Sequence, residues 1–207
     1  AGPGLNSKYD EYFPSVTADE QMFLFTRRLP ATESQSGWQE DFYVSNKVNG
    51  KWADAYGIGP KINSQSNEGA PCLSQDGEIL FFVACEGDFG YGAGRSGFGS
   101  CDIFYSLKNG DDWSKPVNLG SPVCTKWWET QPSFSSDGKT LYFIRGSMNA
   151  KGIKETDICV STLKPGGKWT TPVKLGSNIN TSGSEESVFI HPDNQTLYFS
   201  SDDHPGM

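Results

Sequence analysis

Short apolar runs, each introduced by a polar turn, recur along the 207-residue chain. The four runs are MFLF, ILFF, TLYF and TLYF, which begin at Met22, Ile79, Thr140 and Thr196. The turns before them contain Asp-Gly or an equivalent polar pair, the strongest short signal for a β-hairpin. Because successive residues of these runs are apolar, both faces of each strand are expected to be covered.

The hairpins belong to a longer internal repeat. An acidic turn residue recurs at intervals of 57, 61 and 56 residues, and a glutamate precedes it by eight positions in every copy. A proline stands five positions before the turn residue in three copies, whereas Val188 takes its place in the fourth. Such columns in register indicate a repeat architecture. The turn residues are Asp19, Asp76, Asp137 and Asp193, and the glutamates are Glu11, Glu68, Glu129 and Glu185.

Each complete copy has a second half that begins with an aspartate and an apolar segment. Asp41, Asp102 and Asp157 start these segments, and a tryptophan follows each one, at Trp52, Trp113 and Trp169. One unit therefore predicts four short strands, and the β-branched and aromatic runs disfavour a helical repeat. Units of four strands buried on both faces are typical of β-propeller blades. The predicted fold is all-β, a β-propeller of four-stranded antiparallel blades, with units at about 8–62, 63–123, 124–180 and 181–207.

The last unit is incomplete, so residues 1–207 are expected to form a partial array of about three and a half blades out of about six. An open array of this kind would expose blade faces, which are hazards for aggregation. The remaining blades are expected elsewhere in a longer protein or on another chain. A four-bladed ring, in which residues 1–10 complete the last blade, is the alternative.

Charge and hydropathy restrict the partners. The formal net charge is −8 and no cluster of Lys and Arg occurs, so nucleic acid is disfavoured as a partner. The longest apolar run, Ile79 to Cys85, is far shorter than the roughly 20 residues that span a bilayer. No export signal is recognisable at the start, and any such segment is expected to have been removed or to lie outside these residues.

The sequence EXXPSFSXDGXXLYF, at Glu129 to Phe143, resembles the TolB-type WD-like β-propeller repeat. The stretches WETQP, GSCD and SSDDHPGM are similar to one branch of it, the repeats of OmpA-family, peptidoglycan-associated outer-membrane proteins, among them the type IX secretion component PorE. The resemblance covers essentially the whole chain. It implies a non-catalytic periplasmic scaffold, associated with the outer membrane and with other envelope proteins. Peptidoglycan binding would belong to a domain that is not present in this sequence.

Two of the five cysteines are predicted to form a disulfide. Cys85 ends one strand and Cys101 begins the next, so the two face each other across one hairpin, within disulfide range. Such a bridge would indicate an exported protein, and the alternative is two free thiols. The other three cysteines, Cys72, Cys124 and Cys159, are expected to be small buried residues, not metal ligands.

The glycine-rich loop between Cys85 and Cys101 is the first candidate binding surface. A tethered loop that presents aromatic side chains and an arginine could contact a protein or a glycan, and the alternative is a loop that packs over its own blade. Trp127 is a further candidate, whereas Trp128 is expected to pack between blades. The candidate binding residues are Phe89, Tyr91, Arg95, Phe98 and Trp127.

The recurring acidic residues are predicted to be structural. The four glutamates are expected to accept backbone N–H bonds that lock adjacent blades, although a ring of carboxylates could also hold a cation or a basic peptide. Asp41, Asp102 and Asp157 are expected to cap turns. Neither the two histidines nor Ser96 forms a recognisable metal or nucleophile motif, so no catalytic residue, metal or cofactor is predicted. The alternative function is a propeller of a glycan- or peptide-acting enzyme, or a carbohydrate-binding module; Trp127 is not repeated in each blade, which counts against the latter.

Overall fold

The computed structural model describes all residues except 1, 32–36, 89, 150–151 and 206–207. Its regular secondary structure in this part of the chain consists of β-strands, and no helix there is long and apolar enough to cross a membrane. The chain divides into two compact units, which are described separately. One unit comprises residues 1–96 and 104–117, and the other comprises residues 97–103 and 118–207.

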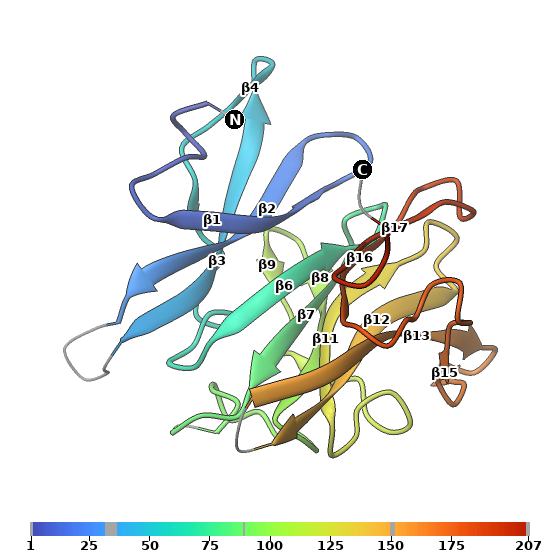
Figure 1. Ribbon diagram of the computed structural model, residues 1–207. Helices are drawn as coiled ribbons and strands as arrows, with labels where there is room; N and C mark the ends of the chain where they lie inside the picture. The colour runs from blue at the N-terminus through green and yellow to red at the C-terminus, as the bar shows by residue number, and fades with distance from the viewer. Residues whose placement is uncertain (1, 32–36, 89, 150–151, 206–207) are drawn as a thin grey trace. The chain divides into compact units, whose positions relative to one another are not determined.

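The first blade is an antiparallel sheet in the order β1, β2, β3 (Figure 1). The fourth strand position is filled by two short segments, β4 and β5, which both pair with β3. Leu24 and Phe25 of the apolar run are buried on opposite faces of β2, as expected for a strand with both faces covered. The strands are β1 (Asp10–Val16), β2 (Met22–Pro30), β3 (Trp38–Val48), β4 (Lys51–Trp52) and β5 (Tyr56–Gly57).

The second and third blades repeat this pattern. In each, three longer strands are followed by two short segments that pair with the third strand. The second blade contains β6 (Glu68–Leu73), β7 (Ile79–Cys85), β8 (Cys101–Asn109), β9 (Asp112–Trp113) and β10 (Val117–Asn118). The third contains β11 (Trp128–Phe134), β12 (Thr140–Asn149), β13 (Gly152–Lys164), β14 (Lys168–Trp169) and β15 (Val173–Lys174). The predicted four-stranded blade is therefore confirmed.

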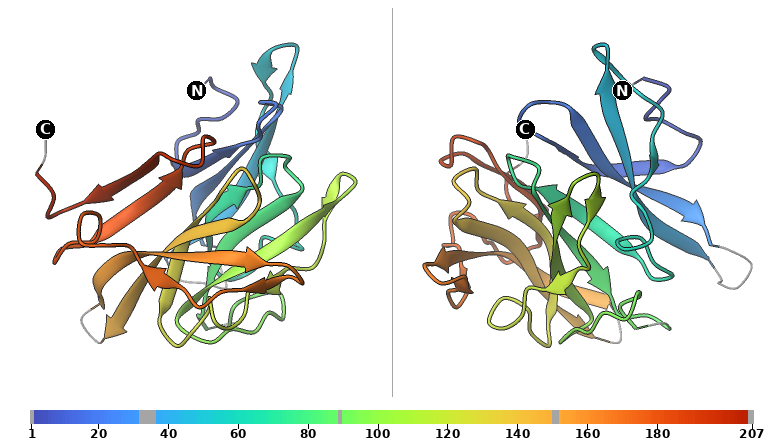
Figure 2. Two further views of the ribbon diagram at one scale, coloured as in Figure 1. Left: turned by 90° about the vertical axis from the view of Figure 1, so that its right-hand side faces the viewer. Right: turned by 180° about the vertical axis from the view of Figure 1, so that it is seen from behind.

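The fourth unit is a two-stranded hairpin of β16 (Glu185–Ile190) and β17 (Leu197–Ser201). Figure 2 shows these two red strands just before the C-terminus. Phe189 and Tyr198 project from the hairpin and are 51% and 57% exposed. This hairpin corresponds to the first two strands of the other three blades.

The predicted turns close in the same way in three blades. The hydroxyl two residues before the turn aspartate donates a hydrogen bond of 2.6 Å to its carboxylate, from Thr17, Ser74 and Ser135. The same carboxylates also accept a backbone N–H two residues later, and these bonds lower the pKa of Asp19, Asp76 and Asp137. This Asx geometry explains why an acidic residue recurs at that position.

A β-bulge marks the first strand of every blade. The residue two positions after the recurring glutamate has a left-handed backbone, with φ between 49° and 55°, and the strand register shifts there. A non-glycine residue in this region is strained, so its recurrence in four copies indicates a built-in bend of the strand. The four residues are Phe13, Ala70, Gln131 and Ser187.

Within each unit, consecutive blades pack by the same rule. Leu80 and Phe82 of the second blade lie in one core with Leu24, Phe42 and Val44 of the first. The Phe42 and Phe82 rings meet edge to face, with centroids 5.6 Å apart. In the other unit, β17 residues pack against Ile144 and Ile158 in the same manner, and the partly buried Trp128 belongs to this cluster, as predicted.

An asparagine in the link between blades fixes this packing. Asn63 accepts the Phe42 N–H at 2.9 Å and donates to the Phe42 carbonyl at 3.0 Å, so one side chain binds both backbone groups of a β3 residue. Asn180 binds Ile158 of β13 in the same way, at 2.8 and 3.0 Å. The third strand of a blade is thus held by the link that leads into the following blade.

Candidate functional site

The recurring glutamates lie at or near the start of the first strand of each blade, and their carboxylates are held by the preceding link. Glu68, Glu129 and Glu185 are fully buried, whereas Glu11 is half-buried. A hydroxyl residue four positions earlier donates its side-chain O–H to the carboxylate in all four blades, and in three of them its backbone N–H as well, at 3.0 to 3.2 Å. The donors are Ser7, Ser64, Thr125 and Thr181.

Two of these carboxylates receive an arginine from the second strand of their own blade. Arg27 lies opposite Glu11 and Arg145 lies opposite Glu129, and each Nε is 2.9 Å from a carboxylate oxygen. Each guanidinium also donates to the carbonyl six residues before its glutamate, that of Leu5 at 2.9 Å or that of Val123 at 2.7 Å. Carboxylate, hydroxyl, arginine and carbonyl form one network that ties the hairpin to the link.

In the second blade the arginine comes from the glycine-rich loop. Ala84 occupies the strand position opposite Glu68, and Arg95 takes the place of the missing guanidinium. Arg95 pairs with Glu68 and donates to the Ile62 carbonyl at 3.1 Å, which is the counterpart of the Leu5 and Val123 carbonyls. Both charged side chains are fully buried. The loop therefore completes the network of its own blade.

Arg95 also binds the link hydroxyl of Ser64, at 2.9 Å, and two carbonyls of its own loop. Its Nε donates to the Tyr91 carbonyl at 2.8 Å and to the Gly92 carbonyl at 3.1 Å. Gly92 has φ of 71°, and a Cβ there would overlap the Ser64 hydroxyl, so only glycine allows this close approach. The glycines of the loop thus permit the arginine to reach Glu68.

Burial dominates the electrostatics of these carboxylates. It raises the pKa of Glu68 to about 7, while Arg95 and Ser64 oppose the rise. Burial also raises the pKa of Glu129, against the opposing bonds from Thr125 and Arg145. A raised carboxyl pKa is one feature of general acids, but here both groups are enclosed by structural partners.

The fourth blade has a different set of partners. Ser201 lies opposite Glu185 and donates to its Oε1 at 3.0 Å, and His204 Nε2 lies 2.9 Å from the Ile179 carbonyl, where the other blades have a guanidinium. Glu185 Oε2 is buried and has no hydrogen-bond partner among the described residues. This site is the one in which the network is incomplete.

The three aspartates expected to start the third strand have different positions and environments: Asp102 is the second residue of β8, whereas Asp41 and Asp157 lie further inside β3 and β13. Asp102 is fully buried, and its Oδ2 accepts the Phe98 N–H at 2.6 Å and the Asn118 side chain at 2.9 Å. Asp157 forms an ion pair with Lys174. Asp41 accepts from Gln39 at 3.0 Å, and burial raises its pKa. Within the described part of the chain, a backbone N–H on the carboxylate, as the sequence predicted for all three, is seen at Asp102.

The candidate binding residues do not gather on one surface. Tyr91 is buried, with its ring centroid 5.8 Å from that of Phe104, and Arg95 is buried with Glu68. Phe98 is 56% exposed. Trp127 is 43% exposed, and the Lys126 ammonium lies 5.0 Å from its ring centroid. Phe89 lies outside the described residues, so Phe98 and Trp127 are the members of this set that remain at the surface.

Cys85 and Cys101 are disulfide-bonded, as predicted. Cys124 and Cys159 are buried free thiols, and burial raises their pKa to about 12 and about 11 respectively. Cys72 is also a free cysteine and is half-buried. High pKa values make the two buried thiols poor nucleophiles and poor metal ligands. Among the described residues no group of three or more metal-ligating side chains occurs.

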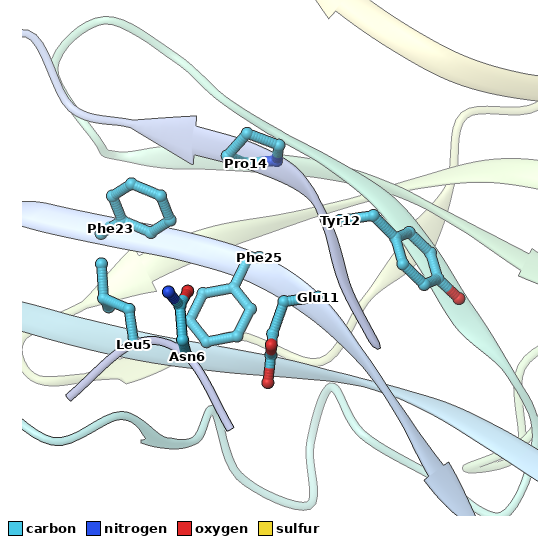
Figure 3. Close-up of a pocket in the computed structure, with 7 residues that line it drawn as sticks. All are labelled: Leu5, Asn6, Glu11, Tyr12, Pro14, Phe23 and Phe25. Atoms are coloured by element: carbon cyan, nitrogen blue, oxygen red, sulfur yellow. The ribbon is translucent and has the colours of Figure 1, made fainter. Parts of the chain in front are cut away.

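One pocket of about 170 Å³ opens on the first blade (Figure 3). Leu5, Asn6, Glu11 and Phe25 point toward one another in the close-up, and the ring of Tyr12 points away from them. The Tyr12 hydroxyl donates to Glu40 at 2.5 Å, and burial and Glu40 raise the pKa of the phenol. The complete lining is Leu5, Asn6, Glu11, Tyr12, Pro14, Phe23 and Phe25. Sequence reasoning selected only Glu11 from this set.

Comparison with known proteins gives similarity in structure alone. No family model and no curated protein matches the chain. TolB from Acinetobacter baumannii has a TM-score of 0.52 at 14% identity, over 95% of this chain and 39% of its own. A putative TolB from Agrobacterium tumefaciens has a TM-score of 0.56 at 15% identity, over 95% of this chain and 60% of its own.

A puromycin-hydrolyzing peptidase of Mycobacterium tuberculosis also matches, with a TM-score of 0.51 at 13% identity, over 95% of this chain and 36% of its own. The chain thus spans between about a third and three fifths of the length of these proteins. At such low identities the likeness shows the fold alone. The chain is built as a β-propeller, a fold that it shares with these proteins.

Proposed function

We propose that this chain is a non-catalytic β-propeller scaffold of a periplasmic, outer-membrane-associated protein, and that it binds other envelope proteins. The finer proposal is the OmpA-family type suggested by the repeat signatures, within a type IX secretion assembly. The main support is the repeated carboxylate network. Three of the four recurring glutamates are paired with an arginine and a link hydroxyl. A carboxylate that recurs in every blade and is hydrogen-bonded to the link before that blade stabilises the fold.

Export is supported by the Cys85–Cys101 disulfide. Disulfides persist in the periplasm and at the cell surface and are rare in a reducing cytosol. The bridge closes the loop that delivers Arg95 to Glu68, so the oxidised state and the buried ion pair belong to the same structural element. Labelling of thiols in freshly lysed cells tests this part. We expect Cys85 and Cys101 to resist a maleimide reagent until reductant is added, and immediate labelling of both would contradict export.

The scaffold role is tested by isolating the protein from its own envelope after mild cross-linking. We expect defined envelope partners in stoichiometric amounts that are absent when the surface residues Phe98 and Trp127 are both replaced by serine. The competing function is a propeller of a glycan- or peptide-acting enzyme, which the likeness to a peptidase favours at the level of fold. Hydrolysis of aryl glycosides or aminoacyl arylamides by the purified protein would overturn the scaffold proposal.

A further inference from the structure

The pocket of the first blade is built from repeat positions whose counterparts are covered elsewhere in the chain. Leu5 corresponds to Ile62 of the second blade, Phe23 to Leu80, and Phe25 to Phe82. All three counterparts belong to the core that contains Phe42 and Val44 of β3. In the second blade, therefore, the same positions are packed against the second and third strands of the preceding blade.

The other unit repeats this arrangement. Ile179, Leu197 and Phe199 are the corresponding residues of the fourth blade, and they pack against Ile158 of β13. Val188, at the position of Pro14, is buried in the same cluster. Two independent copies thus show what this set of positions contacts, namely the second and third strands of the preceding blade.

Asn6 extends the correspondence to the backbone. It occupies the link position of Asn63 and Asn180, each of which binds the N–H and the carbonyl of one third-strand residue. Asn6 itself is exposed and lines the pocket. An asparagine at the mouth of an apolar pocket fits recognition of a strand, since its carboxamide can both donate and accept.

We propose that this pocket is a docking site for the third strand of a further propeller blade carried by another polypeptide segment. The occupant is an extended segment that presents an apolar side chain to Phe23 and Phe25 and the backbone of that residue to Asn6. The two observed occupants define its chemistry. Both have an aspartate just before the bound residue and a valine and a serine after it, as in DFYVS at Asp41 and DICVS at Asp157. The inference rests on the fold and does not require the scaffold role.

A second copy of this chain is a poor occupant. Each of its third strands is already bound by a following link: Phe42 by Asn63, Ile103 by Cys124, and Ile158 by Asn180. A second copy would have to unpack one of its own blades to supply a strand. The docking strand therefore belongs to a blade that is additional to the three complete blades described here.

The first test uses the peptide WQEDFYVSNKV, which is the sequence of β3, labelled with a fluorophore and titrated with the intact chain. We expect saturable binding that Asn6→Ala weakens at least tenfold. The matched control Asn109→Ala, at the exposed last residue of β8, should leave binding unchanged. A peptide with aspartate in place of the bound phenylalanine should fail to bind.

The free edge of β17 could also capture a peptide by adding a strand. A peptide with a benzophenone at the valine two positions after the bound phenylalanine, which lies on the same face of the strand, is therefore photo-cross-linked and mapped by mass spectrometry. Cross-links within residues 5–25 support the proposal. Cross-links confined to β17, binding that is retained in full in Asn6→Ala, or neither binding nor cross-linking at millimolar peptide would overturn it. None of these outcomes bears on hydrolysis or on envelope partners, so the proposed function is tested separately.

Discussion

Replacement of Arg95 by methionine tests whether the loop arginine neutralises a buried carboxylate. Methionine retains much of the side-chain volume and removes all five donors of the guanidinium. Glu68 would then remain fully buried without its cationic partner. Loss of one partner from a buried ion pair costs about 3–5 kcal/mol. We expect a decrease of this size in the free energy of unfolding at pH 8.5.

The loss should depend on pH because the pKa of Glu68 is already raised, from 4.5 to about 7. A raised carboxyl pKa means that the folded state binds more protons than the unfolded state, so stability falls as the pH rises through this range. Without Arg95 the pKa of Glu68 rises further, and the loss grows by up to about 1.4 kcal/mol per pH unit. At pH 5.5 the carboxyl is protonated in the variant, and the loss should shrink to about 1–2 kcal/mol from the missing hydrogen bonds.

The assay is equilibrium unfolding in urea without reductant, followed by tryptophan fluorescence at both pH values. Trp52 and Trp113 belong to the same compact unit as Arg95 and report on it. The double variant Arg95→Met with Glu68→Gln should recover most of the loss at pH 8.5, because no uncompensated charge then remains. A loss that is equal at the two pH values, or a double variant that loses the sum of the single changes, would refute this account of the pair.

Three further predictions concern other parts of the repeat. Cys85→Ser with Cys101→Ser should lower the free energy of unfolding by about 3 kcal/mol, as expected for a loop of this length, and reductant should lower the wild type equally and leave the variant unaffected. Glu129→Gln, which leaves Arg145 without its carboxylate partner, should lower the free energy of unfolding in urea by about 2–3 kcal/mol, whereas Glu185→Gln should lower it by about 1 kcal/mol or less. The reverse order would show that the arginine does not matter. Ser187→Gly should raise the free energy of unfolding by about 0.5 kcal/mol. Glycine relieves the strain of the left-handed backbone, about 1–2 kcal/mol, and this gain exceeds the cost of the added entropy of the unfolded chain. Ser182→Gly is its control, and equal destabilisation of both variants would contradict the strain.

The sequence was sufficient for the fold because the repeat specifies it through local signals. Apolar runs beside Asp-Gly turns predict the hairpins, and Leu80 and Leu141 are buried as required. The disulfide followed from the same reasoning, since Cys85 and Cys101 end and begin neighbouring strands of one hairpin. The four β-bulges were not predicted. Phe13, Ala70 and Gln131 share no side-chain property, because it is the strand bend that sets their backbone, and the bend leaves no fixed residue type.

The role of Arg95 was missed for a different reason. The sequence makes it a candidate for contact with a partner, with a loop packed over its own blade as the alternative, and its fully buried side chain fits the alternative. The signal was present in the spacing. Arg27 and Arg145 each follow their glutamate by 16 residues, and at that interval the second blade has Ala84. The second blade thus lacks an arginine on its second strand and has one in the adjacent loop. Once the Glu–Arg pairing across the hairpin is known from the other blades, this pattern predicts that Arg95 pairs with Glu68.

The fourth blade shows how far this compensation extends. Ser201 stands at the arginine position, and His204, which follows the second strand as Arg95 does, approaches the Ile179 carbonyl. The imidazole thus takes over the carbonyl contact of the guanidinium, while Glu185 Oε2 stays without a hydrogen bond among the described residues. A buried carboxylate oxygen in this state costs free energy that the other three blades avoid. Glu185 is therefore the recurring glutamate whose ionised form is least stabilised by its own blade, which is why its replacement by glutamine is expected to cost less than that of Glu129.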